Sequence, residues 1–532
     1  MRRPSSTLSL DMNILSRSSA AVAAPVALAL LAGCGGDGTG PAADACAGAP
    51  GSAAAGPELR LAPGEARPLA AGRSLCLVLP DTEHAYVLAY VDTRASDAAR
   101  QGPEPALDSV TVRVRDLGGG ARTALSAAAA HPGLAVEEPD FATVRAQSQP
   151  LTHPAWRQAP WSEGETFPLF DDRRNLERSA RVQRVYGSWL VVAAFVDEET
   201  PALTTTLGML DAGWPILRDL GLPLLRAAFG EALPITSAGS GQLLLMVRGD
   251  LGTAVGMAFG TVVGPDVLSW LAITPNAPNS TRTPTSLASL VQHELTHAFQ
   301  RVHLNASRPA GEPVTPHLGA AVWGIEGGAT FMQRELARRQ AGVSPTANYD
   351  WLNPGATEAE TWYANFAPPA DGTFTNGYSA AAGFLAHLAG RRIAAGESVD
   401  AAVAAVSRGA VEGWYGHVRP GAAAWTGLTA RMRARLGGGW EPTDALLGWT
   451  LSHAMDDRTP SAMYQDAAFL GASRIRPPGY GWAPHATLAA GSGAQAEVRR
   501  AHGSPGYFEL SGRGAFHLTA PEGVRWMVAR VR

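Results

Sequence analysis

Residues 293–300 read HELTHAFQ and place two imidazoles and a carboxylate close together in the chain. If this segment is helical, His293 and His297 project from one face, about one turn apart. That separation suits two imidazole nitrogens on one tetrahedral zinc ion. Glu294 is rotated by one residue, so it does not bind the metal but is placed to accept a proton from a water beside it. The segment therefore predicts a site for metal-assisted hydrolysis.

A buried helix over residues 286–302 is predicted to position these side chains. Apolar residues recur there at helical spacing, namely Leu287, Leu290, Val291, Leu295, Ala298, Phe299 and Val302. Pro284 and Thr285 are start signals, and we expect Thr285 or Ser286 to cap the helix. The alternative is a buried helix whose two histidines are satisfied without a metal. The H-E-x-x-H pattern on a buried helix that follows strands favours the metal.

Two residues compete for the role of third ligand, and the first is His303. It lies six residues after His297, the spacing of the metzincin pattern HExxHxxGxxH, in which a glycine breaks the helix. Gln300 stands at that position here. In an unbroken helix, six residues at about 100° each turn His303 by about 240° beyond the full turn, away from His297. We therefore expect His303 to interact with helix-terminal carbonyl groups instead.

The second candidate is Glu326, which 28 residues separate from His297, in the segment WGIEGGATFMQREL. This segment predicts a helix that opens just after Trp323, with Glu326 in its first turn. It resembles the W-x-x-E-G-x-A element of the gluzincin zinc peptidases, a superfamily that includes a family of aminopeptidases. The residues that match this element are Trp323, Glu326, Gly327 and Ala329. The helix geometry favours Glu326 over His303 as the third ligand.

Two departures separate this chain from the aminopeptidase family proper. Ile325 stands where those enzymes usually have asparagine, and the spacing between the two elements is longer. Both departures fit a divergent bacterial branch, in which HExxHxxQ is followed by EGxA. The resemblance covers residues 243–392. It implies a thermolysin-like catalytic domain with a strand-rich upper half, an active-site helix and a helical lower half.

The same resemblance implies roles for particular residues. Zinc would be held by His293, His297 and Glu326, with Glu294 as general base. Gluzincins often take an oxyanion donor from a downstream helix, and Tyr378 in FTNGYSAAAGFLAHL is the best candidate; its alternative role is packing at a helix start. An edge strand, from residues 242–250 or 257–263, would bind an extended peptide by β-augmentation.

Composition excludes several other classes of protein. At 532 residues the chain predicts two to four domains, and 46% hydrophobic residues predict a packed globular protein. A formal net charge of −4 argues against a nucleic-acid partner. The 43 basic residues are all arginines, which rules out a Walker A lysine, a Schiff-base lysine and a Ser–Lys dyad.

The amino terminus reads as an export signal. Arg17 precedes an apolar stretch over residues 20–32, which is too short to span a bilayer. The sequence LAGC that closes it resembles the lipobox of bacterial lipoproteins, which implies cleavage before Cys34, lipid attachment there and a membrane anchor. The alternative is a plain secretory signal. We therefore expect a cell-envelope protein on the periplasmic or cell-surface side, in which Cys46 and Cys76 form one disulfide or remain two thiols.

Five segments are expected along the chain: a signal peptide with lipobox (1–34), a flexible tether (35–56), an amino-terminal β module with linker (57–160), the catalytic domain (161–460) and a β-rich segment (461–532). Alternating Val110, Val112 and Val114 predict a half-buried strand in the first module. Residues 185–197 and 242–250 read as strands, and the chain from residue 286 onward as mostly helices. The predicted fold class is α+β, with a small antiparallel β module before the catalytic domain and a short β tail after it.

The function that fits these features best is zinc-dependent hydrolysis of peptide bonds in peptide or protein substrates. One alternative is a catalytically silent envelope binding protein on a gluzincin scaffold. Such a protein would be expected to lack Glu294 or one metal ligand, and here all are present. The other alternative is a non-proteolytic zinc hydrolase, because H-E-x-x-H defines the metal and the base but not the substrate.

Overall fold

The structure is a computed structural model. It describes residues 55–63, 65–69, 74–80, 83–92, 109–117, 157–171, 174–249, 251, 255–263, 266–275, 282–307, 322–341, 377–415, 447–448, 451, 486–501 and 506–531. The predicted signal peptide with Cys34, the tether with Cys46 and most of the linker lie outside these ranges. Two kinds of architecture are present, a mixed α+β region and a β-sandwich, which are described separately.

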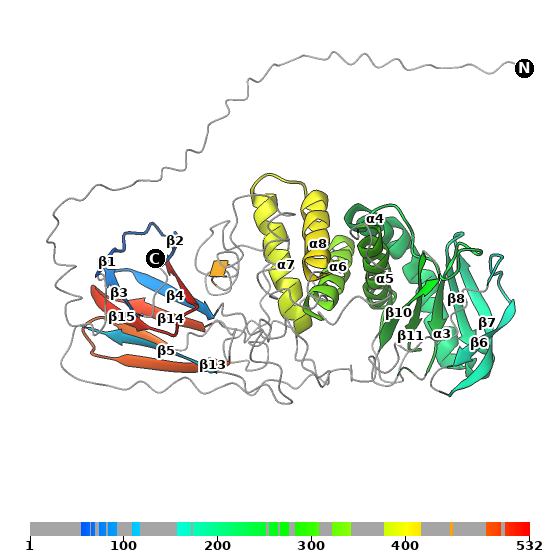
Figure 1. Ribbon diagram of the computed structural model, residues 1–532, viewed down its shortest axis with the longest axis horizontal. Helices are drawn as coiled ribbons and strands as arrows, with labels where there is room; N and C mark the ends of the chain where they lie inside the picture. The colour runs from blue at the N-terminus through cyan, green and yellow to red at the C-terminus, as the bar shows by residue number, and fades with distance from the viewer. Residues whose placement is uncertain are drawn as a thin grey trace, which may run out of the picture. The chain divides into compact units, whose positions relative to one another are not determined.

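The α+β region is built on a six-stranded sheet of order β10-β11-β9-β8-β7-β6 (Figure 1). The strands are β6 (Thr166–Asp171), β7 (Leu176–Tyr186), β8 (Leu190–Phe195), β9 (Leu243–Val247), β10 (Gly256–Val263) and β11 (Asp266–Ile273). The inner strands β8, β9 and β11 run parallel to one another, and the remaining pairs are antiparallel. Strands β8 and β9 read LVVAAF and LLLMV and are buried throughout, as expected of inner strands covered on both faces.

Two predictions about these strands need correction. Residues 185–197 are not one long strand, because Gly187, at φ 60°, turns the chain between the end of β7 and the start of β8. The apolar residues on both sides of this glycine concealed the turn. Of the two proposed edge strands, residues 242–250 form the inner strand β9, whereas β10 lies at the end of the sheet.

The helices of this region lie between β8 and β9 in the chain or follow β11. They are α3 (Pro201–Ile216), α4 (Leu222–Phe229), α5 (Pro284–Ala306), α6 (Val322–Ala341), α7 (Gly377–Ala394) and α8 (Val399–Tyr415), with a π-helical segment, η3 (Leu217–Gly221), between α3 and α4. Helices α3 and α5 contact the sheet, and the other helices pack on helices. Helix α5 contacts strands β10 and β11 on one side and helix α6 on the other. Leu295, Ala298 and Phe299 of α5 are buried in the core between sheet and helices.

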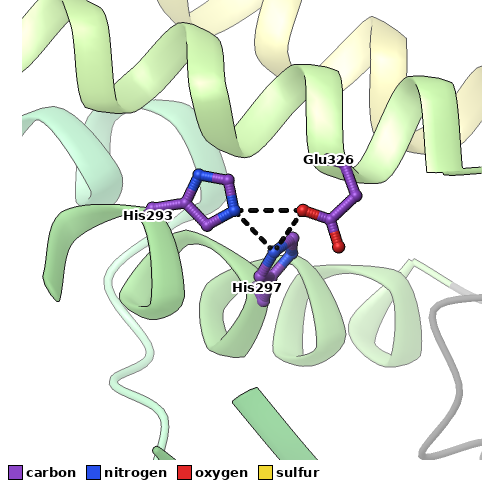
Figure 2. A group of neighbouring side chains, drawn as sticks. All are labelled: His293, His297 and Glu326. Atoms are coloured by element: carbon purple, nitrogen blue, oxygen red, sulfur yellow. Dashed lines mark hydrogen bonds and ion pairs between the residues drawn. The ribbon is translucent and has the colours of Figure 1, made fainter. Parts of the chain in front are cut away.

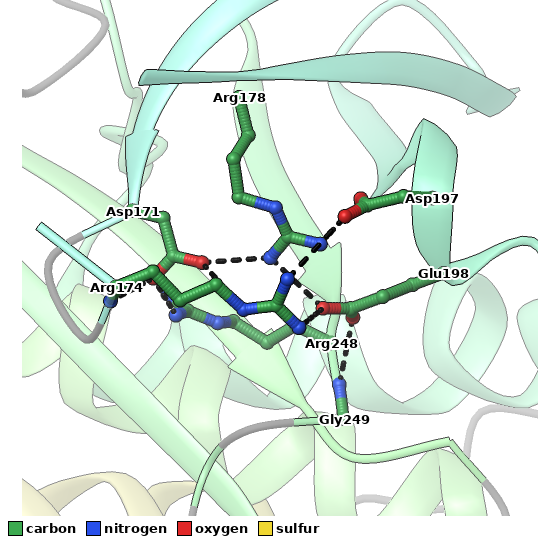
Figure 3. A network of polar contacts seen from close by, with 7 residues as sticks. All are labelled: Asp171, Arg174, Arg178, Asp197, Glu198, Arg248 and Gly249. Atoms are coloured by element: carbon green, nitrogen blue, oxygen red, sulfur yellow. Dashed lines mark hydrogen bonds and ion pairs between the residues drawn. The ribbon is translucent and has the colours of Figure 1, made fainter. Parts of the chain in front are cut away.

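A network of charged side chains lies at the end of the sheet formed by β6 and β7 (Figure 3). Asp171, which is fully buried, accepts hydrogen bonds from Arg178 at 2.7 Å and from Arg248 at 2.9 Å. Arg178 also pairs with Asp197 and with Glu198, both in η2 (Val196–Glu198). Burial lowers the pKa of Arg178, but its hydrogen bonds to the three carboxylates outweigh burial and raise that pKa above the ordinary value. The network connects β6, β7 and the residues that lead from β9 towards β10.

The β-sandwich combines strands from both ends of the chain. One sheet has the order β1-β3-β15-β5-β13 and the other β12-β14-β4-β16-β2. The strands are β1 (Ala55–Glu58), β2 (Ala66–Pro68), β3 (Ser74–Leu79), β4 (Ala85–Asp92), β5 (Ser109–Asp116), β12 (Ala486–Ala489), β13 (Gln495–Ala501), β14 (Gly506–Ser511), β15 (Gly514–Thr519) and β16 (Val524–Arg530). Leu77, Tyr90, Phe508, Phe516 and Trp526 share its core.

The sandwich corrects the predicted domain plan. Residues 57–160 and 461–532 were expected to form two separate β segments, one before and one after the catalytic domain. Instead, β5 lies between β13 and β15, and β4 lies between β14 and β16. The α+β region is therefore an insertion within one sandwich. Alternation within a strand shows which side chains are buried but does not identify the partner strand, so sequence reasoning could not find this pairing.

Two findings bear on the predicted location of the protein. Cys76, in β3, is disulfide-bonded. Its partner lies outside the described residues, so the pairing with Cys46 stays a prediction. Among the described residues, no helix has the length and hydropathy needed to cross a membrane.

Candidate metal centre

Helix α5 begins at Pro284, two residues before the predicted start. Thr283 caps it, its hydroxyl accepting from the Ser286 amide at 3.2 Å while the Ser286 hydroxyl accepts from the Thr283 amide at 2.8 Å. Pro284 is the first helical residue, a position at which its missing N–H costs nothing. The prediction of Thr285 or Ser286 as cap was therefore wrong. The helix then runs without a break through Gln300 to Ala306.

His293, His297 and Glu326 meet between α5 and α6 (Figure 2). Glu326 Oε2 lies 3.0 Å from His293 Nε2 and 3.1 Å from His297 Nε2, and the two Nε2 atoms are 3.2 Å apart. The imidazole rings are nearly perpendicular, at 83°. Three potential ligand atoms thus form an almost equilateral triangle, made by two residues one turn apart on α5 and one residue from α6.

The hydrogen-bond partners of the two rings determine where their protons lie. His293 Nδ1 lies 3.2 Å from Gln333 Oε1, and His297 Nδ1 lies 3.1 Å from Gln300 Oε1. A carboxamide oxygen only accepts hydrogen bonds, so each Nδ1 must carry the proton. In the neutral rings, both Nε2 lone pairs then point into the triangle. This is the tautomer that a metal requires at Nε2.

The orientation of Gln300 is itself determined by a second contact. Its amide nitrogen donates to the Ile325 carbonyl oxygen at 3.2 Å, which directs its oxygen towards His297. Gln300 is fully buried, and a Cβ on Gly328 of α6 would approach its amide nitrogen to 3.0 Å. The glycine therefore allows α6 to lie close to α5. Gln300 and Gln333 contact the two histidines, and sequence reasoning did not identify these contacts.

The triangle fits a metal ion of the size of zinc. Bonds of about 2.0–2.1 Å in tetrahedral geometry separate neighbouring ligand atoms by about 3.3–3.4 Å, a few tenths of an ångström more than the observed edges. Burial raises the pKa of Glu326, but His297 and His293 outweigh burial and bring it below the ordinary value. Glu326 is therefore a carboxylate, as a ligand must be. These three residues could hold a metal ion.

Glu294 lies beside this group but does not belong to it. It is 5% exposed, and no described residue donates a hydrogen bond to its carboxylate. Burial raises the pKa of Glu294 to about 7. Glu326 also acts to raise this pKa, whereas His293 and Arg301 act to lower it. A carboxylate with this pKa is suited to accept and return a proton near neutral pH. This agrees with the prediction that Glu294 is not a ligand.

His303 lies away from the metal centre, as the unbroken helix predicts. Its Nδ1 is 3.2 Å from the Phe229 carbonyl oxygen, and its Nε2 is 2.8 Å from Glu412 Oε1. The terminal carbonyl that His303 contacts belongs to α4 and not to its own helix. His303 thus connects α5 to α4 and α8.

The other predicted site residues are described only in part. Glu326 lies just beyond the first turn of α6, which begins at Val322. Tyr378 lies in the first turn of α7, but its side chain is outside the described residues, as is that of Trp323. The role of Tyr378 as oxyanion donor stays a prediction.

Comparison of the chain with models of known protein families, with curated proteins and with solved structures finds no match.

Proposed function

We propose that this protein is a zinc-dependent peptidase of the gluzincin type, with a thermolysin-like catalytic domain. The observation that carries the proposal is the triangle of His293, His297 and Glu326, with Glu294 on the adjacent helical position. Two histidine nitrogens and one carboxylate oxygen are a donor set of catalytic zinc sites, in which a fourth position stays open. The side chains of His293 and Glu326 are 13% and 20% exposed, so solvent reaches this side of the site.

The residues of the chain divide the chemistry among them. Zinc held by the three ligands would supply Lewis acidity, which polarises a substrate carbonyl and activates water. Glu294 removes a proton from the attacking water and delivers it to the leaving amine. Gln300 and Gln333 hold the two imidazoles in the ligand tautomer. The predicted role of Tyr378 is to donate a hydrogen bond to the oxyanion.

Strand β10 supports a peptide as the substrate. It lies at the end of its sheet and packs on α5, the helix that carries Glu294. The outer edge of such a strand presents backbone groups to which an extended chain adds by β-augmentation. This arrangement favours a peptidase over a non-proteolytic zinc hydrolase.

We further propose that the protein acts in the cell envelope, anchored by a lipid at Cys34. The support is the LAGC sequence after an apolar segment and the disulfide at Cys76. Disulfides persist in oxidising compartments and are rare in the cytoplasm of most organisms.

Elemental analysis of purified protein lacking residues 1–34 tests this proposal, with Glu326→Ala and His303→Ala compared with wild type. We expect one zinc per wild-type chain, its loss in Glu326→Ala and its retention in His303→Ala, because His303 bonds to Glu412. Hydrolysis of a peptide library by the zinc-loaded wild type should accompany this result. Zinc without hydrolysis of peptides would favour the binding protein or another hydrolase, and a wild type without zinc would refute the proposal.

A further inference from the structure

Helix α5 presents two buried charged residues to strand β10. Glu294 and Arg301 are seven residues apart, which is within about 20° of two full helical turns, so both lie on the same face. They are 5% and 8% exposed. Arg301 donates to the carbonyl oxygens of Ala258, at 2.6 Å, and Phe259, at 3.3 Å. The guanidinium therefore binds the backbone of β10 directly.

Glu294 meets the same strand at Gly256. A Cβ added to Gly256 would lie 3.0 Å from Glu294 Cδ and closer still to Oε1, which no real Cβ tolerates. Gly256 is not among the glycines with positive φ, so its backbone conformation is open to any residue. A side chain at this position would therefore displace the Glu294 carboxylate through lack of space and not through backbone strain. Its backbone forms a wall against which the Glu294 carboxylate packs.

The two contacts are in register along the helix and the strand. Seven helical residues rise by about 10.5 Å, and the three residues from Gly256 to Phe259 extend by about 10 Å. When Arg301 holds the carbonyl groups of Ala258 and Phe259, Gly256 therefore comes to lie beside Glu294. If the strand shifted by one residue, Gly256 would no longer lie against the Glu294 carboxylate.

We infer that Gly256 and Arg301 are positioning residues that hold the Glu294 carboxylate in place beside the metal ligands. The inference rests on the proposed function, in which Glu294 is the general base. No described residue donates a hydrogen bond to this carboxylate, so packing against the strand determines its position. Arg301 keeps the strand in place through its two hydrogen bonds. Its positive charge also offsets part of the negative charge of Glu294 and Glu326.

The first test is structural and does not depend on turnover. Crystal structures of the zinc-loaded Gly256→Ala and Gly249→Ala proteins are compared with that of the wild type. Gly249 is a matched control, because it lies between β9 and β10, has no positive φ, and an added Cβ would meet only Glu198 Oε2, at 3.9 Å. We expect the Glu294 carboxylate to move relative to His293 only in Gly256→Ala. An unmoved carboxylate in that variant would overturn the inference.

The second test measures kcat, KM and zinc content. We expect Gly256→Ala to keep its zinc and a KM within twofold of wild type, while kcat falls on the order of 100-fold, the effect of misplacing a reacting group by about 1 Å. Gly249→Ala should keep the kcat of wild type. A kcat for Gly256→Ala equal to that of Gly249→Ala would contradict the inference.

Arg301 is tested by graded replacement. Arg301→Gln should lower kcat with zinc retained, and Arg301→Lys should recover only part of it, because lysine keeps the charge but lacks the planar fork that binds two carbonyl oxygens. Full kcat in Arg301→Gln would show that the arginine does not position the base. If the zinc-loaded wild type cleaves no peptide, the proposed function fails, whereas the crystal structures still decide whether Gly256 places Glu294.

Discussion

Replacement of Gln300 by methionine should weaken zinc binding far more than the same change at Gln333. Each amide oxygen accepts a hydrogen bond from a histidine Nδ1: Gln300 Oε1 lies 3.1 Å from His297 Nδ1, and Gln333 Oε1 lies 3.2 Å from His293 Nδ1. Their surroundings differ, because Gln300 is fully buried whereas Gln333 is half-buried. Water can therefore replace the amide oxygen of Gln333 but not that of Gln300.

The magnitude follows from the two tautomers of His297. In metal-free Gln300→Met, His297 can move its proton to Nε2 and donate it to Glu326 Oε2, 3.1 Å away, so little is lost. With zinc on Nε2, the proton must stay on Nδ1, buried without an acceptor, which costs about 1–3 kcal/mol. The zinc Kd should rise by about 5- to 150-fold, since 1.4 kcal/mol is a factor of ten. For Gln333→Met we expect less than about fivefold.

Competition with a chromophoric zinc chelator at constant pH and ionic strength measures both Kd values. The lost hydrogen bond to the Ile325 carbonyl is absent with and without zinc, so it lowers folding stability but leaves the Kd unchanged. The Tm of each metal-free variant monitors this separate effect. A Kd for Gln300→Met within twofold of wild type, or an equal loss in Gln333→Met, would refute the assignment of tautomers.

Three further outcomes are expected. Glu294→Gln should keep its zinc while kcat falls by about 10²- to 10⁴-fold; loss of zinc in that variant would show a structural role instead. Asp171→Ala leaves two buried arginines without their shared carboxylate, so urea denaturation should show a free energy of unfolding lower by about 3–5 kcal/mol, and a change below about 1 kcal/mol would contradict this. Burial and Arg115 lower the pKa of His517 from 6.5. As the pH falls, the unfolded state therefore takes up a proton before the folded state does. The free energy of unfolding should decline as the pH falls below about 6.5 and should not depend on His517 at higher pH. Urea midpoints measured across this pH range should show that decline in wild type and a flatter dependence in His517→Gln.

The helix of the metal centre was predictable because its information is local. His293 and His297 lie one turn apart in any α-helix, and the unbroken helix through Gln300 directs His303 away from the site. Glu326 was reached through a resemblance to gluzincins, and the structure places it at 3.0 Å from His293. The spacing of residues along this helix also indicates a contact between Gln300 and His297, which sequence reasoning did not use. Gln300 follows His297 by three residues, which puts it on the same helical face.

What sequence reasoning missed depends on contacts between distant segments. The space that Gly256 leaves is filled by Glu294, which lies on another element. Gln333 acquires its role only because α6 lies alongside α5. In the sandwich, strands β4 and β5 show ordinary alternation, yet both are flanked by strands that begin between residues 495 and 524. Periodicity records which face of a strand is buried and contains no information about its neighbours.

The interleaved sandwich also makes the order of synthesis matter. Strands β1–β5 leave the ribosome well before β14 and β16, so β4 gains these two neighbours only after residues 506–530 have been made. Until then its apolar side chains and both of its edges are available for pairing with other chains. Pairings that span more than 370 residues, such as Arg115 with Gln495, are slow to form. In a nascent chain β4 therefore stays unpaired until β14 and β16 have been made, and loss of β16 alone would leave β4 with an open edge.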